Sequence, residues 1–226
     1  MKMIVGCINE KTAKGCIRAI KKAARHGASL VELRIDHLDT LDASSLQQII
    51  RASPLPVIAT LRRKGNGGLF KGKEGKRIEI LKAAINAGAK YVDIELDSSE
   101  NEQCEIRALA NATACRVIVS QHDFRSTPSS RTLLSWLDKG SRVGDIVKIA
   151  TKADDIEDCA RILNLLGTAR KRGIPLVAFA MGEKGKFTRV VSLLCGSLWT
   201  YCATTKSVAP GQISIRDVRE SMRLLK

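Results

Sequence analysis

Short apolar runs with strand character recur along the whole chain, and stretches with helical periodicity lie between them. The eight runs are MIVGCI (3–8), LVELRI (30–35), PVIATLR (56–62), YVDIEL (91–96), RVIVSQH (116–122), DIVKIAT (145–151), PLVAFAM (175–181) and LWTYCAT (198–204). Strand–helix alternation requires parallel strands joined by right-handed crossover connections. Eight such units close into a (β/α)8 barrel, and 226 residues suffice for a compact one. We therefore predict an α/β fold, a TIM barrel that forms one domain over residues 1–226.

An open, doubly wound sheet is the alternative arrangement of such units. It is disfavoured because no G-x-G-x-x-G motif follows the first strand. The segments RHGAS, NAGAK and KRGIP each place a glycine shortly before the next strand, where a helix is expected to end.

Charged residues alternate with apolar ones in two of the predicted strands. Glu32, Arg34 and Asp36 share one face of VELRID, and Asp93 and Glu95 share one face of YVDIEL. If the apolar faces pack under helices, the charged faces converge on the barrel axis. The charges also lie towards the carboxyl ends of their strands, where the active sites of such barrels are built.

A lysine interrupts the β-forming segment GDIVKIAT (144–151), and the alternation of side chains points this Lys148 inward. A buried ammonium is costly unless it pairs with an anion or gives up its proton. A lysine that loses its proton is a nucleophile at neutral pH. An ion pair with Asp93 or Glu95 is the structural alternative, and the pattern leaves both open.

His122 ends the fifth predicted strand, next to the strand that carries Lys148. An inward lysine beside an inward histidine, with no metal cluster and no nucleotide motif, indicates imine chemistry on a carbonyl substrate. Arg62, at the end of the third strand, and Arg189, after the loop MGEKGKFTR, could clamp a substrate carboxylate because guanidinium bonds both oxygens. A structural role for His122 and a surface position for either arginine are the alternatives.

Two glycine-containing segments look like mobile loops. KGNGGLFKGKEG (64–75) is basic but lacks the G-K-[ST] of a phosphate-binding P-loop. SVAPGQI (207–213) joins proline and glycine at a turn after the last strand, where a lid could form.

The chain carries a formal net charge of +15. A nucleic-acid surface and attraction of small anionic substrates both explain such a charge. Four phenylalanines, two tryptophans and two tyrosines leave few rings on which bases could stack, and the basic residues occur in every segment. We therefore expect a basic soluble protein that does not bind nucleic acid, and a nucleic-acid-binding protein stays the non-enzymatic alternative.

The sequence contains no membrane signal and no pattern of metal-binding cysteines. No apolar run approaches the roughly 18 residues of a membrane span, and the first residues lack the apolar core of a signal peptide. The seven cysteines include no CxxC pair, which disfavours both a zinc site and a disulfide framework. We expect a cytoplasmic protein that does not bind a membrane.

Seven segments together resemble the type I 3-dehydroquinate dehydratase family, the Schiff-base lyases of the shikimate pathway. VELRID, TLR…GG, YVDIEL, SQHDF, VKIAT, MGEKG…TR and APGQIS occur in the order of that family and span nearly the whole chain. The resemblance implies conversion of 3-dehydroquinate to 3-dehydroshikimate and water, without cofactor or metal. It also implies a homodimer, since members of the family are often dimeric.

The resemblance assigns roles to particular residues. Lys148 would form the imine with the ketone of the substrate, and His122 would be the general acid and base. The positions that line the substrate in the family match Glu32, Arg34 and Arg62 on the polyol side, Arg189 at the carboxylate and Gln212 in the lid.

Two positions depart from the family. Asn66 stands where many members carry an acidic residue thought to orient the histidine, so we expect His122 to titrate lower than in relatives. The lid reads VAPGQ instead of SAPGQ, which puts Val208 at the serine position and Ser207 one residue early.

A class I aldolase-like barrel is the enzymatic alternative, because it also uses an imine lysine. Such enzymes normally handle phosphorylated sugars, which predicts a glycine-rich phosphate grip after the seventh and eighth strands. MGEKGKF could form half of that grip, but APGQ lacks the character of the other half.

Overall fold

The computed structural model describes residues 3–205 and 209–225. It contains one sheet of eight parallel strands. The strands are β1 (Met3–Ile8), β2 (Leu30–Arg34), β3 (Val57–Thr60), β4 (Tyr91–Glu95), β5 (Arg116–Asp123), β6 (Ile146–Lys152), β7 (Leu176–Met181) and β8 (Trp199–Ala203). All eight coincide with the runs predicted from the sequence, with differences of one or two residues at their ends.

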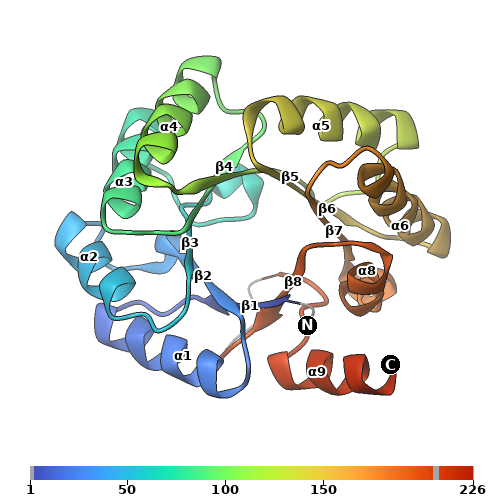
Figure 1. Ribbon diagram of the computed structural model, residues 1–226, viewed down its shortest axis with the longest axis horizontal. Helices are drawn as coiled ribbons and strands as arrows, with labels where there is room; N and C mark the ends of the chain where they lie inside the picture. The colour runs from blue at the N-terminus through green and yellow to red at the C-terminus, as the bar shows by residue number, and fades with distance from the viewer. Residues whose placement is uncertain (1–2, 206–208, 226) are drawn as a thin grey trace.

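The strands follow one another around the barrel in sequence order, and β8 pairs in parallel with β1. Between β7 and β8 no regular ladder forms, but the amide of Leu198 donates a hydrogen bond of 3.0 Å to the carbonyl of Leu176. The barrel is therefore nearly closed, and the predicted TIM-barrel fold is confirmed. Figure 1 shows the strands at the centre and the helices as an outer ring.

The longer helices lie between consecutive strands, as right-handed crossovers require. They are α1 (Ala13–Arg25), α2 (Ala43–Arg51), α3 (Glu74–Asn86), α4 (Glu100–Thr113), α5 (Ser130–Val143), α6 (Ile156–Lys171), α8 (Thr188–Cys195) and, after β8, α9 (Ile215–Leu224). Short helical turns follow three strands: η1 (Ile35–His37), η2 (Lys64–Asn66) and α7 (Gly182–Gly185).

Side chains at helix starts explain where several of these helices begin. Ser99 accepts a hydrogen bond from the amide of Glu102, whose carboxylate accepts one from the amide of Ser99, which is a capping box. Ser214 and Asp217 repeat the arrangement at α9. Each pair satisfies amides that the first turn of a helix leaves without partners.

The apolar side chains form an inner and an outer layer. Val31, Leu33, Val92 and Ile94 point outward and pack under the helices. The inner layer fills the barrel and consists of Val5, Cys7, Leu30, Ile58, Ile118, Ile146, Ala150, Val177, Phe179, Met181, Trp199 and Tyr201. The predicted assignment of strand faces is confirmed, because the alternating charged residues lie inside above this layer.

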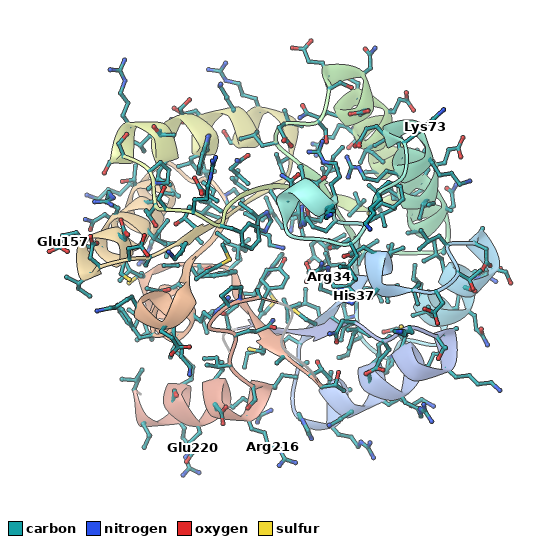
Figure 2. The ribbon with its side chains drawn as sticks, turned by 180° about the vertical axis from the view of Figure 1, so that it is seen from behind. Arg34, His37, Lys73, Glu157, Arg216 and Glu220 are labelled. Atoms are coloured by element: carbon teal, nitrogen blue, oxygen red, sulfur yellow. The ribbon has the colours of Figure 1, made fainter. Side chains whose placement is uncertain are left out.

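Most charged side chains lie on the outside. Lys73, Glu157, Arg216 and Glu220 lie at the periphery in Figure 2, whereas Arg34 lies near the centre. Within the described ranges, no helix has both the length and the apolar character needed to cross a bilayer.

Candidate active site

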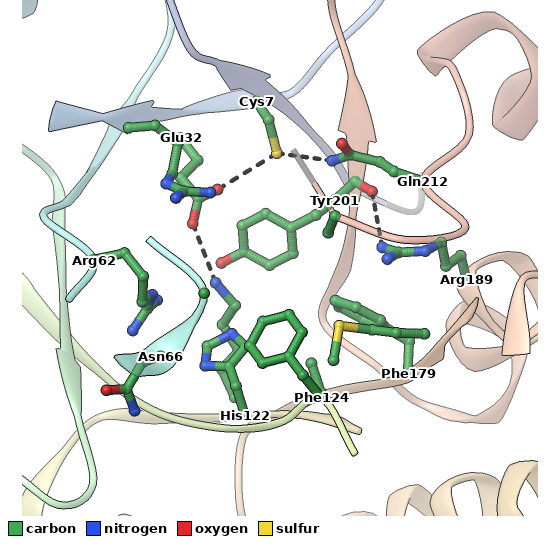
Figure 3. Close-up of a pocket in the computed structure, with 16 residues that line it drawn as sticks. Cys7, Glu32, Arg62, Asn66, His122, Phe124, Phe179, Arg189, Tyr201 and Gln212 are labelled. Carbon is green, nitrogen blue, oxygen red and sulfur yellow. Dashed lines mark hydrogen bonds and ion pairs between the residues drawn. The ribbon is translucent and has the colours of Figure 1, made fainter. Parts of the chain in front are cut away.

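A pocket opens at the carboxyl ends of the strands, the end of the barrel where such proteins bind ligands. The empty space at this end is about 460 Å³, a value that includes open solvent. Its lining residues are Cys7, Glu32, Arg34, Arg62, Asn66, Gly67, His122, Phe124, Lys148, Ala150, Phe179, Met181, Arg189, Tyr201, Ala209 and Gln212 (Figure 3). Every site residue predicted from the sequence is in this set.

Lys148 is buried at the centre of the pocket on β6. Its Nζ donates hydrogen bonds to Glu32 Oε1 at 3.1 Å and to Asp93 Oδ2 at 3.2 Å. Burial favours the neutral amine, but the negative charges, with Glu32 foremost, outweigh it and hold the pKa of Lys148 above its ordinary value. The structural alternative, a paired Lys148 ammonium, is therefore present in the free protein. The predicted ion pair forms with Asp93 but not with Glu95.

Glu32 is held in place by two further donors. Its Oε1 accepts a hydrogen bond from the hydroxyl of Thr60 at 3.1 Å, and its Oε2 accepts one from Cys7 Sγ at 3.4 Å. Burial opposes ionisation, yet the charges of Lys148 and Arg34 lower the pKa of Glu32. The carboxylate is thus charged and fixed beside the amine.

Arg62 contacts three protein groups through its two terminal nitrogens. Its guanidinium contacts Asp93 at 2.8 Å, Glu95 at 3.0 Å and the hydroxyl of Ser120 at 2.7 Å. Two carboxylates therefore neutralise Arg62 before any ligand binds. This pairing disfavours Arg62 as the clamp for a substrate carboxylate and leaves Arg189 as the better placed of the two.

Arg34 forms two parallel hydrogen bonds with Asp36, at 3.0 and 2.7 Å. Asp36 also accepts hydrogen bonds from the amides of Leu69, at 3.1 Å, and Arg62, at 3.4 Å. One buried carboxylate therefore orients Arg34 and ties the segment after β3 to the rim of the pocket. Phe70 anchors the same segment, because its side chain is buried and its carbonyl accepts a hydrogen bond from the amide of Lys64 at 2.9 Å.

Arg189, the second residue of α8, is completely buried. Its guanidinium donates to the backbone carbonyls of Tyr201 at 3.4 Å and Pro210 at 3.0 Å and lies 4.3 Å from the ring of Phe179. No carboxylate among the described residues pairs with it. Burial lowers the pKa of Arg189 to about 10. A buried cation that lacks an anion is a strong binding site for an anionic ligand.

His122, near the end of β5, stacks on Phe124 with ring centroids 6.0 Å apart and an interplanar angle of 11°. Its Nδ1 has no hydrogen-bond partner among the described residues, so Asn66, which also lines the pocket, does not hold the imidazole. Burial, with the positive charges of Arg62 and Lys148, keeps the pKa of His122 well below its ordinary value. The imidazole is neutral and can accept a proton.

The segment after β8 covers one side of the pocket. Gln212 Nε2 donates to Cys7 Sγ at 3.1 Å, which links this segment to β1. Ala209 also lines the pocket. Ser207 and Val208, the positions at which the sequence departs from the family, lie outside the described residues.

Sequence reasoning missed the aromatic part of the site. Tyr201 lies against the Lys148 ammonium, which is 4.1 Å from the centroid of its ring. In the same way, the Arg189 guanidinium lies over the ring of Phe179. Strands β7 and β8 carry no charged residue, so the alternation of charged and apolar side chains gave no signal as to which side chains point inward.

Fold and site together define a (β/α)8-barrel protein with a buried, lysine-centred pocket. Within the described ranges, no group of three or more His, Cys, Asp and Glu side chains is arranged to hold a metal ion.

The chain belongs to the type I 3-dehydroquinase family, whose sequence profile matches residues 4–226. It is 38% identical over 225 residues to the 3-dehydroquinate dehydratase of Methanopyrus kandleri, covering 99% of this chain and 100% of that one. The crystal structure of 3-dehydroquinate dehydratase from Geobacillus kaustophilus HTA426 superposes with a TM-score of 0.94 at 28% identity, over 100% of this chain and 91% of that one. The enzyme of the same name from Aquifex aeolicus VF5 gives a TM-score of 0.83 at 29% identity, covering 98% of each chain.

Proposed function

We propose that this protein is a lyase of the shikimate pathway that dehydrates 3-dehydroquinate to 3-dehydroshikimate through an imine on Lys148. Membership of the type I 3-dehydroquinase family supports the reaction. The observation that carries the mechanism is the placement of the Lys148 amine, a neutral His122 and the unpaired cation Arg189 around one pocket. The chemistry uses side chains of this chain and water alone.

The ion pairs of Lys148 fit imine formation because the step conserves charge. An ammonium ion and a neutral ketone give a protonated imine and one molecule of water. Two of the three protons on nitrogen leave with the ketone oxygen, and the third stays on the imine. Glu32 and Asp93, which neutralise the ammonium at 3.1 and 3.2 Å, neutralise the iminium ion equally well. The free amine needed for attack forms transiently, when one proton passes to a neighbouring base such as His122.

The protonated imine then draws electrons from the neighbouring carbon. His122 removes a proton from that carbon, and the electron pair of the broken C–H bond moves towards the imine nitrogen. When the pair returns, the bond to the hydroxyl on the next carbon breaks, and His122 returns its proton to the departing oxygen, which leaves as water. Hydrolysis of the imine by a second water releases the product and regenerates Lys148.

The remaining residues bind and orient the substrate in this scheme. Arg189 binds the carboxylate, since it is the buried cation without an anion. Glu32, Arg34 and Arg62 lie on the opposite side and contact the hydroxyl groups. Gln212 closes the pocket over the bound molecule.

The test is an assay with purified protein and 3-dehydroquinate. We expect an increase in ultraviolet absorbance as the conjugated product forms, and loss of at least about a hundredfold of the turnover in His122→Ala, as for removal of one acid–base group. Absence of product with the wild-type protein would refute the proposed reaction. Unchanged turnover in His122→Ala would leave His122 a structural role only.

A further inference from the structure

The phenol of Tyr201 is a buried polar group that the mechanism above does not use. Tyr201 lies on β8, and only 3% of its surface is exposed. Its ring supports the Lys148 ammonium, with Nζ 4.1 Å from the ring centroid. The ring crosses the pocket with its hydroxyl end towards Glu32 and Arg62 (Figure 3).

The hydroxyl oxygen of Tyr201 has no hydrogen-bond partner among residues 3–205 and 209–225. The indole nitrogen of Trp199, two residues earlier on the same strand face, is near the phenol but forms no hydrogen bond of normal geometry with it. A buried hydroxyl without a partner is unfavourable. Because Tyr201 lines the pocket, a bound molecule can supply the missing partner.

The aromatic contacts define which part of a bound substrate meets this hydroxyl. The Tyr201 and Phe179 rings touch, with centroids 6.2 Å apart. Phe179 supports Arg189, the proposed carboxylate site, while Tyr201 supports Lys148. The phenol therefore belongs to the end of the pocket where the ketone meets the amine, and not to the carboxylate end.

We propose that the Tyr201 hydroxyl is a further catalytic group, which donates a hydrogen bond to the ketone oxygen of the substrate and relays protons from Lys148 Nζ to that oxygen. The inference rests on the proposed imine mechanism. As the C–N bond forms and the C=O π bond breaks, the phenol gives its proton to the oxygen and takes one from nitrogen. A second relay of the same kind converts the carbinolamine to water and the neutral imine. The imine then takes back the proton held by the neighbouring base and becomes the protonated imine, so Tyr201 ends unchanged.

The chemistry of the phenol agrees with this role. Burial raises the pKa of Tyr201 above its ordinary value, so the hydroxyl keeps its proton and acts as a donor at neutral pH. The adjacent Glu32 and Asp93 are already occupied by Lys148. The Tyr201 hydroxyl is therefore a neutral donor that can turn towards a ligand and donate a hydrogen bond to the ketone oxygen.

The chain offers a matched pair of variants, because it has two tyrosines. Tyr201→Phe removes the pocket hydroxyl and keeps the ring under Lys148. Tyr91→Phe removes the hydroxyl of a ring that packs edge-on against Trp199, with centroids 5.5 Å apart, and does not line the pocket. For each variant we would measure the rate at which borohydride-trapped adduct appears on Lys148, in H₂O and in D₂O, and the midpoint of thermal unfolding.

Tyr201→Phe should slow adduct formation by about a hundredfold, the lower range for one acid–base group. Its unfolding midpoint should not fall, because the deleted hydroxyl is unpartnered, and the solvent isotope effect on adduct formation should shrink. Tyr91→Phe should leave the adduct rate and its isotope effect unchanged.

Three results would overturn the role of Tyr201: a wild-type adduct rate in Tyr201→Phe, an undiminished isotope effect, or equal slowing in both variants. A wild-type protein that forms no adduct on Lys148 would instead refute the underlying imine mechanism, and the role of Tyr201 with it.

Discussion

Two of the four buried cationic side chains that line the pocket differ in their surroundings. Lys148 is neutralised by Glu32 and Asp93, whereas Arg189 contacts only backbone carbonyls and an aromatic ring among the described residues. The first arrangement holds the positive charge that the proposed imine would carry. The second leaves a charge that no carboxylate of the described residues neutralises and that an anionic ligand can neutralise. The two ends of the pocket therefore differ in charge. The end proposed to react has a neutralised cation, the end proposed to bind the anion has an uncompensated one, and two aromatic rings lie between them.

Arg189→Met tests whether Arg189 is the binding site for the substrate carboxylate. The variant should weaken kcat/KM by about a hundredfold or more, because hydrogen bonds between charged groups contribute about 1.5–3 kcal/mol each. Its free energy of unfolding should fall by less than in Arg62→Met, because among the described residues Arg189 donates hydrogen bonds to two backbone carbonyls and pairs with no carboxylate. Steady-state kinetics and urea unfolding of the same samples check both expectations.

Arg62→Met is the matched control for stability. Removing the Arg62 guanidinium leaves the buried carboxylates of Asp93 and Glu95 with fewer cations to neutralise them. The free energy of unfolding should therefore fall by about 3–5 kcal/mol. Equal stability losses in the two variants would contradict the distinction between a paired and an unpaired arginine.

At the scale of single elements, the sequence predicted which face of each charged strand points inward but not the contacts between strands. The alternation in β2 and β4 placed Glu32 and Asp93 inside the barrel, as observed. Whether Lys148 met Asp93, Glu95 or neither depended on the heights of β4 and β6 in the barrel. Those heights follow from registers such as Asp93↔Ile118 and Ser120↔Lys148, which no local pattern encodes.

For the strands without charged residues, such as β8, the sequence did not even predict which face points inward. Tyr201 lies between Thr200 and Cys202, and no charged residue in β8 marks one of its faces as the inner one. Its place beneath Lys148 follows only from closure of the barrel, in which β8 returns to pair with β1.

The turn after η2 offers a prediction at the element scale. Gly67 has a φ of +80°, and a Cβ at this residue would lie 2.2 Å from the ring of Phe124, which stacks on His122. Gly67→Ala should therefore displace Phe124, loosen the imidazole and lower kcat. Gly65→Ala is the matched control, because a Cβ there meets no atom within 4 Å. Steady-state assays of both variants check the prediction, and equal kcat values would show that the turn does not position His122.

At the scale of the whole molecule, the site assembles from distant parts of the chain. Lys148 and Glu32 are 116 residues apart in sequence, and Arg62 reaches Ser120 across 58. The buried charges are therefore compensated only when the barrel is complete. Folding of the barrel and formation of the pocket are one event, and ionisation of the pocket is linked to global stability.

His122 provides the test of that linkage. Its pKa in the folded protein is lowered, first by burial and then by Arg62 and Lys148, so the unfolded chain binds a proton that the folded protein does not. This contribution to stability is complete above the unfolded value of about 6.5 and declines as the pH falls below it. Between pH 6.5 and 5, the free energy of unfolding should fall more steeply for wild type than for His122→Gln, by at most about 1.4 kcal/mol per pH unit. Urea unfolding at several pH values measures both slopes, and parallel slopes would contradict a buried, neutral imidazole.

The central claim is that the amine of Lys148, stored as a cation between two carboxylates, forms a covalent imine with a ketone in the pocket. The most direct measurement is borohydride reduction in the presence of 3-dehydroquinate, followed by mass spectrometry of the peptides. We expect one irreversible adduct, located on Lys148 and absent from Lys148→Ala, which should also be inactive. An unmodified wild-type protein, together with a catalytically competent Lys148→Ala variant, would contradict it.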